Sequence, residues 1–226
     1  MGIAGVDGNG QDELADVIAG LRPLEGGQIL VDNTEVNRFS PGKRIEHGLS
    51  YIPSDRQQVG LILDLSIAEN LILKGFRHAP FSKLGILLDR NSIDANAEKM
   101  IKEFDVRVSH GDVKIRLLSG GNQQKVILAR EISSHPKVLI AMQPTRGLDV
   151  GSTKYVHRRI LDHREKGGAT LFISTELDEI IAISDRIAVI FEGEIMGIFP
   201  NGPDIDLEQI GLMMAGVKEC KTRSVG

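Results

Sequence analysis

The sequence has little of what a secreted, membrane-spanning or base-stacking protein would use. It contains no tryptophan, aromatic residues make up 4%, and Cys220 is its only cysteine. A lone cysteine excludes an internal disulfide and fits a reducing cytosol, while scarce aromatic rings argue against stacking platforms for nucleic acid. No uncharged apolar run reaches the ~18 residues of a spanning helix, and the amino-terminal residues lack the pattern of a signal peptide. We therefore expect any membrane link to come through a partner.

The overall composition is that of a soluble globular domain. Hydrophobic residues make up 41% of the 226 residues and charged residues 26%, with a net charge of −4. This charge favours neither broad nucleic-acid binding nor binding to anionic membranes. The length suits one domain with a substantial core.

Strand and helix patterns alternate at both ends of the chain. Continuous apolar runs at 138–142 and 169–174 are typical of strands buried on both faces, as in a parallel sheet, and 187–191 with 194–199 indicates a hairpin. Between 66 and 134 the pattern is helical, with helices expected at 66–74, 91–104 and 119–133 joined by polar loops. The prediction is an α/β domain with a mostly parallel sheet, formed by 1–65 and 135–216, an inserted helical subdomain at 66–134, and a loose tail at 217–226.

The most specific motif is LSGGNQQK at 118–125. Ser119 can cap the helix that follows, and glycines leave the backbone N–H groups at a helix N-terminus uncovered. Such a terminus binds phosphate through free N–H groups and the positive end of the helix dipole. The motif residues at and around this turn are Leu118, Ser119, Gly120, Gly121, Asn122 and Gln123.

With its context, this motif resembles the signature of ABC-type ATPases. PTRGLD at 144–149 is similar to the D-loop of that family, with Asp149 as its aspartate, and IAGVDGNGQ at 3–11 is similar to its Walker A region. The likeness extends over about 3–216. It is strongest to the second cassette of double-cassette importers for simple sugars and nucleosides, which implies a P-loop NTPase fold of the ABC type. It also implies that the antiparallel strands and the adenine-stacking aromatic residue of the family would precede Met1.

The glycine-rich loop departs from a working P-loop. That motif needs a lysine to neutralise phosphate and a Ser or Thr to hold Mg²⁺, and here these positions are Gln11 and Asp12. The backbone cradle can still form, but acidic residues surround it without a base. We expect a degenerate nucleotide-binding loop made of Gly5, Asp7, Gly8, Asn9, Gly10, Gln11 and Asp12.

The resemblance also places replaced residues at the catalytic positions. Met142 and Gln143 stand where the family has an Asp that supports Mg²⁺ and a Glu that polarises water, and Thr175 stands where it has the switch histidine. The glutamine of the Q-loop, near Ser54, is also missing. None of the catalytic residues that the resemblance implies is therefore intact. Because loss of one transition-state group typically costs ~10²–10³ in rate, this site should be nearly inactive.

Other candidate residues are weaker. The neighbours Asp55 and Arg56 form either a solvated ion pair or a contact to a transporter coupling segment. His157 and His163 are expected to be solvated on a polar helix face, and the histidines show no metal-ligand spacing, so no metal site is predicted.

The resemblance implies that cassettes work in facing pairs, with each ATP held between one Walker loop and the signature of the other cassette. This chain would complete the ATP and Mg²⁺ site of a partner cassette with a full Walker set, on the cytoplasmic face of the cell membrane. The pair would drive permease subunits, served indirectly by a solute-binding protein, with no nucleic acid involved. The alternatives are an ATPase active in its own right and a soluble ABC protein outside transport. The sequence names neither the cargo nor the polypeptide that carries the first cassette.

Overall fold

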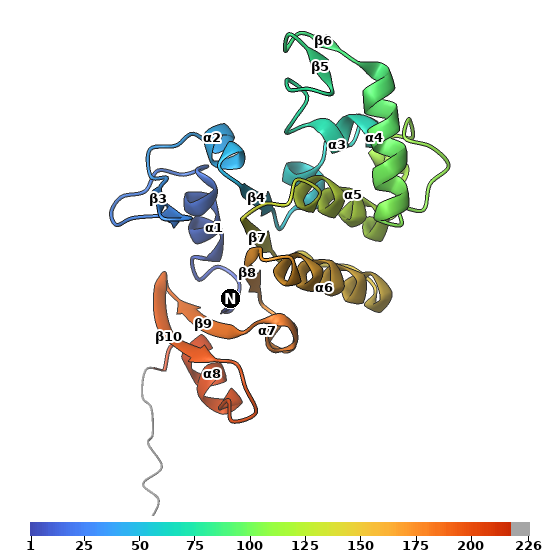
Figure 1. Ribbon diagram of the computed structural model, residues 1–226. Coiled ribbons are helices and arrows are strands. Elements are labelled where there is room, and N and C mark those ends of the chain that lie inside the picture. Colours follow the sequence, from blue (N-terminus) through green and yellow to red (C-terminus); the bar gives the residue numbers. More distant parts are fainter. Residues whose placement is uncertain (218–226) are drawn as a thin grey trace, which may run out of the picture.

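A six-stranded sheet forms the centre of the protein, for which the computed structural model describes residues 1–217 (Figure 1). The strand order is β10-β9-β1-β8-β7-β4, and every neighbouring pair is parallel except β9 and β10. The strands are β1 (Gly2–Ala4), β4 (Leu49–Ile52), β7 (Val138–Met142), β8 (Ala169–Ser174), β9 (Arg186–Phe191) and β10 (Glu194–Pro200). The predicted tail lies, from residue 218 onward, outside the described residues.

Helices cover both faces of this sheet. The helices are α1 (Gln11–Ala19), α2 (Pro41–Glu46), α3 (Ile67–Ile72), α4 (Arg90–Glu103), α5 (Gly120–Ile132), α6 (Val150–Glu165), α7 (Leu177–Ile183) and α8 (Leu207–Met214). The sequence of β7 is apolar throughout because successive side chains of a strand point to opposite faces, and both faces of this strand are buried. Leu139 and Ala141 pack in one apolar cluster, and Ile140 and Met142 pack in the other. The α/β fold with a mostly parallel sheet is confirmed.

Short elements connect the main ones. Strands β2 (Leu30–Val31) and β3 (Thr34–Glu35) form a separate antiparallel pair after α1. The short π-helix η1 (Arg56–Gly60) precedes α3, and the short 3₁₀ helix η2 (Ile115–Leu117) lies between α4 and α5. Figure 1 places α3 and α4 in a lobe beside the sheet, with α5 returning toward it. The apolar cluster that contains Phe104 and Ile115 also contains Leu139 and Phe172, so lobe and sheet share one core. The domain boundaries at 66 and 134 stay a prediction.

Three local expectations need comment. The hairpin predicted at 187–199 is confirmed as β9 and β10. The expectation that only polar loops join the helices of 66–134 is wrong, because β5 (Ser82–Lys83) and β6 (Leu87–Leu88) form a hairpin with an apolar tip. The expectation that the α6 histidines are solvated is also wrong: His163 is 3% exposed, and the His157 ring packs edge-on to that of Phe172 at 6.1 Å. Their face of α6 packs against β8, which a polar local sequence does not reveal.

A buried charge cluster joins the lobe to the sheet side of the molecule. Glu131, near the end of α5, is fully buried and accepts hydrogen bonds from Lys74 Nζ and, at 2.8 Å, from Arg130 Nε. Burial lowers the pKa of Lys74, partly opposed by the Glu131 carboxylate. Arg130 also donates to the carbonyl of Gly60 at 2.8 Å. The Glu131 carboxylate therefore connects Lys74, which follows α3, with Arg130 of α5, and Arg130 connects α5 to the backbone of Gly60.

Replacing Glu131 by alanine is expected to lower the free energy of unfolding by about 3–5 kcal/mol, since it leaves two cations without their buried partner. Urea denaturation followed by circular dichroism measures this loss. Glu165→Ala, at the exposed end of α6, is the matched control and should change the value by less than about 0.5 kcal/mol. A loss below about 1 kcal/mol for Glu131→Ala would show that the cluster contributes little.

Candidate functional site

The glycine turn of the LSGGNQQK motif begins helix α5. Ser119 is the N-cap residue, as expected, but its hydroxyl makes no capping bond to the backbone. Instead Ser119 Oγ accepts a hydrogen bond from Asn122 Nδ2 at 3.1 Å, and Asn122 Oδ1 accepts from the backbone N–H of Arg107 at 2.9 Å. The first turn of a helix has no intrahelical acceptors for its N–H groups, so this uncapped turn leaves those groups available to an anion.

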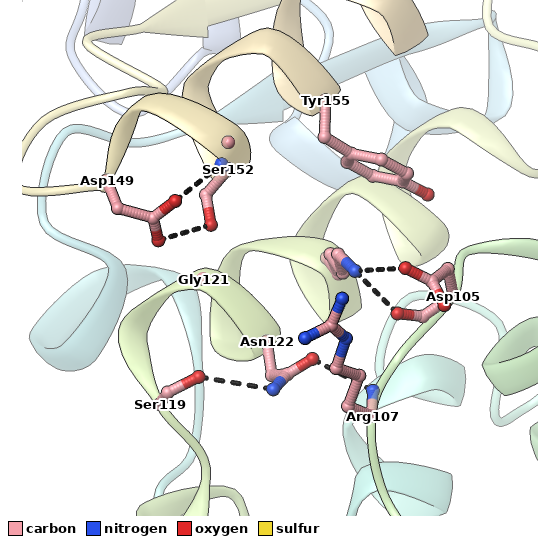
Figure 2. A pocket seen from close by; sticks show the side chains of 10 residues that line it. Asp105, Arg107, Ser119, Gly121, Asn122, Asp149, Ser152 and Tyr155 are labelled. Atoms are coloured by element: carbon pink, nitrogen blue, oxygen red, sulfur yellow. Dashed lines mark hydrogen bonds and ion pairs between the residues drawn. The ribbon is translucent and has the colours of Figure 1, made fainter.

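A cavity of about 310 Å³ opens in front of this turn. The N-terminus of a second helix, α6, also borders the cavity. Asp149 caps this helix by accepting hydrogen bonds from the Ser152 N–H at 2.9 Å and from Ser152 Oγ at 2.8 Å (Figure 2). These bonds hold the pKa of the Asp149 carboxyl below its usual value. The residues lining the cavity are Asp105, Arg107, Ser119, Gly121, Asn122, Lys125, Asp149, Gly151, Ser152 and Tyr155. The open N-terminus of α5, the Asp149-capped N-terminus of α6 and the side chains of Arg107 and Lys125 thus face one space, which the carboxylates of Asp105 and Asp149 also line.

Several of these lining residues escaped the sequence reading. Lys125 Nζ donates to the carbonyl and the carboxylate of Asp105, both at 2.6 Å, and Tyr155 donates to the Phe104 carbonyl at 2.7 Å. Arg107 makes its hydrogen bond through the backbone, and Figure 2 shows its guanidinium directed into the cavity. Helical spacing of Ser152 and Tyr155 after Asp149 could have indicated the α6 residues, whereas nothing local marks Asp105 or Arg107.

Gln123 is positioned differently from the other motif residues. Its side chain is 3% exposed and donates to the carbonyls of Ile115 and Leu118, both at 3.3 Å. It does not line the cavity. Leu118 is half-buried and packs on the apolar core. These two residues therefore fix the turn from behind, and Ser119, Gly121 and Asn122 form the face that a ligand would meet.

Residues 55–60 pack against helix α5. Asp55 caps the η1 turn by accepting from the N–H groups of Gln57 and Gln58, both at 2.9 Å. Arg56 Nη1 donates to the Arg146 carbonyl at 2.7 Å, and a Cβ added at Gly120 would lie 2.9 Å from Arg56 Nη2. Gln57 Nε2 donates to Gln123 Oε1 at 3.3 Å. Asp55 and Arg56 do not pair with each other; Arg56 instead joins the PTRGLD segment to the start of α5.

The glycine-rich loop before α1 closes around Gln11. This side chain is 3% exposed, donates to the Val6 carbonyl at 2.9 Å, and accepts from the Asn9 N–H at 2.9 Å. It therefore uses one of the amides that would otherwise form the phosphate cradle. Gly8 and Gly10 have φ of 86° and 100°, which favours glycine, so the loop keeps its backbone shape without a charged side chain at its centre.

Carboxylates dominate the rim of this loop. Partial burial, followed by the charges of Asp7 and Glu13, raises the pKa of Asp12 above its usual value. Asn9 ties the loop to the β9–β10 turn, because its Oδ1 accepts from the Glu192 N–H and its carbonyl from the Gly193 N–H, both at 2.9 Å. The sequence reading assigned Asn9 to the loop but missed this contact across 183 residues. The loop that was predicted to be degenerate is therefore surrounded by carboxylates in the structure.

The end of strand β7 carries Met142 and Gln143, two of the positions predicted to have lost catalytic residues. Met142 is fully buried beneath the sheet surface, as predicted. Gln143, at φ 42°, donates through Nε2 to Asp7 Oδ1 at 3.4 Å. Thr175 lines the same cavity of about 460 Å³ as Asp7 and Gln143. The structure thus brings Asp7, Gln143 and Thr175, three positions of the predicted site, together around one cavity, which Glu176 and Glu179 also line.

Glu179 is the ionised group that holds this region in place, and the sequence reading missed it. Its Oε2 accepts from Thr145 Oγ1 at 2.6 Å and from Ser174 Oγ at 3.2 Å, and His157 Nε2 lies 3.7 Å from Oε1. Burial alone would raise the pKa of Glu179, but the neighbouring His157 and the two hydroxyl donors hold it below its usual value. One carboxylate of α7 thereby joins the ends of β7 and β8.

Glu179→Gln is expected to lower the free energy of unfolding by roughly 1–2 kcal/mol at neutral pH, since it weakens bonds to a charged acceptor. A depressed carboxyl pKa stabilises the fold above the ordinary value of 4.5, and this contribution is lost as the pH falls through the lower, folded-state value. Urea denaturation of both proteins should therefore give curves that differ most at neutral pH and converge in acid. A difference that grows on acidification would contradict the assignment.

The fold and these two glycine turns define the class. A mostly parallel sheet with a glycine loop before its first helix, joined to a lobe that presents a second glycine turn, is the architecture of an ATP-binding cassette. The chain belongs to the ABC transporter family, whose model matches residues 1–146. Among solved structures, a nucleotide-free ATP-binding cassette from an ABC transporter superposes with a TM-score of 0.78 at 21% identity, covering 97% of this chain and 87% of that one.

Curated relatives are similar over nearly the whole chain. The guanosine import ATP-binding protein NupO of Bacillus subtilis is 45% identical over 96% of this chain and 42% of its own length. The nucleoside import ATP-binding protein NupA of Lactococcus lactis is 46% identical with the same coverages, and the glucose import ATP-binding protein TsgD13 of Haloferax volcanii is 47% identical over 96% and 39%. The chain thus spans about two fifths of the length of these relatives. Among the described residues, no helix is long and apolar enough to cross a membrane.

Proposed function

We propose that this chain is the second-cassette portion of the ATP-binding subunit of an ABC importer for nucleosides or simple sugars. In this proposal its signature turn completes the ATP site of a partner cassette, and its own Walker site is degenerate. The observation that carries the proposal is the contrast between the two glycine turns. The turn at Ser119 is uncapped and open to a cavity, whereas the loop at Gly5–Asp12 is closed on the Gln11 side chain.

The residues present fit ATP with Mg²⁺ at the composite site but not at the chain's own loop. At the composite site the partner would hold the metal, and the metal would neutralise phosphate charge when bound. This chain would supply helix N–H groups, the Ser119 hydroxyl and the Arg107 guanidinium for the phosphates. At its own loop Gln11 consumes the Asn9 amide, and Asp7, Asp12 and Glu13 repel a polyphosphate. No step of hydrolysis is assigned to that loop.

The names of the relatives support the transport part of the proposal. NupO and NupA are import ATP-binding proteins for guanosine and nucleosides, and TsgD13 is one for glucose. By analogy the chain would sit on the cytoplasmic face of the membrane, attached to permease subunits and served indirectly by a solute-binding protein. The nucleoside relatives make a nucleoside cargo the first to test.

The test is to measure ATP hydrolysis by the purified chain, by a cassette with a full Walker set from the same importer, and by their mixture. The proposal expects background turnover from the chain alone and turnover from the mixture well above the sum of the two parts. The second candidate, an ATPase active in its own right, predicts turnover by the chain alone that a Gly120→Asp change leaves intact, and that outcome would overturn the proposal.

A further inference from the structure

The β5–β6 hairpin has an unusual turn. Ile86 donates its N–H to the Lys83 carbonyl at 3.3 Å, and the two central residues, Leu84 and Gly85, have φ of 57° and 71°. A turn with two positive φ values favours Asn or Asp followed by Gly, and a bulky side chain in this conformation is an outlier that costs free energy. Leu84 contributes nothing to the core in return, because it is 95% exposed.

Apolar side chains surround the whole tip. Ile86, Leu87 and Leu88 are 83%, 67% and 57% exposed, and nearby Phe76 is also exposed. Leu87 and Leu88 are adjacent in one strand, so their side chains point to opposite faces of the hairpin. Each face of the hairpin therefore carries an exposed leucine, with Leu87 paired to Lys83 and Leu88 paired to Ser82. Exposed apolar residues grouped in this way mark an interaction site.

The segment that carries this tip is cationic. Residues 74–90 contain four basic side chains, Lys74, Arg77, Lys83 and Arg90, and a single carboxylate, Asp89. Lys74 pairs with the buried Glu131, and Arg90 pairs with Asp94 and Asp112, so the cations that the tip itself presents are Arg77 and Lys83. Lys83 lies 3.7 Å from Asp89 and is 76% exposed, and Arg77 packs over the Phe76 ring. The net charge of −4 does not favour binding to anionic partners by the molecule as a whole. At this tip, however, Arg77 and Lys83 provide a local positive charge that does favour it.

We propose that the hairpin 82–88 inserts its tip into the headgroup region of an anionic lipid membrane. Apolar side chains enter the boundary between headgroups and acyl chains, and Lys and Arg nearby are attracted to anionic lipids. A fluid surface can surround a tip whose apolar side chains point in all directions, whereas a flat protein surface would meet only one face. The inference goes beyond the proposed function and does not depend on a partner cassette.

The position of the hairpin suits such a contact. Figure 1 shows β5 and β6 at the outer end of the α3–α4 lobe, far from β10 and α8 at the opposite end of the molecule. Among residues 1–217, the space beside the turn is open, since a Cβ added at Gly85 would meet only the Arg77 carbonyl, at 3.5 Å. The hairpin can therefore reach a membrane while the cavity at Ser119 stays accessible.

The absence of tryptophan supplies a direct reporter. In the full-length chain carrying Leu84→Trp, the tryptophan emission should shift to the blue on mixing with vesicles of phosphatidylcholine and phosphatidylglycerol, and should not shift with phosphatidylcholine alone. Leu212→Trp, on exposed α8, is the matched control and should show no shift with either vesicle.

Vesicle co-flotation of otherwise unaltered protein measures the affinity. Leu84→Asp with Ile86→Asp should lower the bound fraction at least ~10-fold, Lys83→Glu should lower it less, and Leu212→Asp should leave it unchanged. Binding should weaken as salt is raised, and a thermal melt checks that the exposed substitutions leave the fold intact. Failure of the parent chain to float with anionic vesicles, or flotation only when permease is present in them, would overturn the proposal in favour of no contact or a protein contact.

Discussion

Replacing Gly120 by aspartate is expected to lower ATP hydrolysis by the assembled cassette pair at least ~100-fold. The new carboxylate would stand in the first turn of α5, whose free N–H groups meet the phosphates of the partner's ATP in the proposed composite site. Its Cβ would also lie 2.9 Å from Arg56 Nη2. The carboxylate would therefore draw Arg56 away from the Arg146 carbonyl and disturb the PTRGLD segment as well.

The measurement is the turnover of the chain mixed with its partner cassette at saturating ATP. Gly202→Asp adds the same charge in open space, with no atom within 4 Å of the new Cβ, and should leave turnover unchanged. Circular dichroism of both variants separates loss of activity from loss of fold. Equal turnover of Gly120→Asp and Gly202→Asp would mean that the signature turn does not contact the hydrolysed nucleotide.

The glycines of the loop before α1 could be predicted from the sequence because the backbone conformation itself requires them: Gly8 and Gly10 adopt positive φ. Gly121 was found from the motif, but its structural requirement comes from another helix, because Ser152 Oγ lies only 2.5 Å from where a Cβ would stand. The other predicted features can be read locally. The burial of Met142 was likewise readable from the uninterrupted apolar run of β7. These features depend on residues close together in the chain, or on the hydrophobic pattern of a strand.

What the sequence did not reveal depends on contacts between distant residues. Arg56 bonds to Arg146 across 90 residues, and the acceptor is a carbonyl that every residue type has. Glu179 gains its role from the hydroxyl groups of Thr145, which follows β7, and Ser174, at the end of β8. The hydrogen bonds of the Gln11 side chain within the loop could not be predicted either. A glutamine in place of the lysine indicates a lost charge, but it does not indicate that the side-chain amide bonds to Asn9 and Val6.

Restoring a base and a hydroxyl to the degenerate loop is expected to raise its affinity for Mg·ATP by roughly 10- to 100-fold, the equivalent of one charge-assisted contact. The double variant is Gln11→Lys with Asp12→Ser. A lysine removes the acceptor that now holds the Asn9 N–H, so the change both adds a cation and returns an amide to the cradle. The serine removes a carboxylate whose pKa is already raised by burial and by neighbouring acids.

Titration with a fluorescent ATP analogue in the presence of Mg²⁺ measures this gain. Gln28→Lys with Asp178→Ser makes the same change of charge at exposed positions outside the loop and should leave the affinity unchanged, while Gln11→Lys alone should give part of the gain. Hydrolysis by the double variant should stay at background, because Met142 and Gln143 still provide no carboxylate for metal or water. An unchanged affinity would mean that the acidic rim and the contact of Asn9 with the β9–β10 turn, rather than the missing lysine, keep phosphate out. ATP turnover by the variant without a partner cassette would contradict the expected inactivity of the site at Met142 and Gln143.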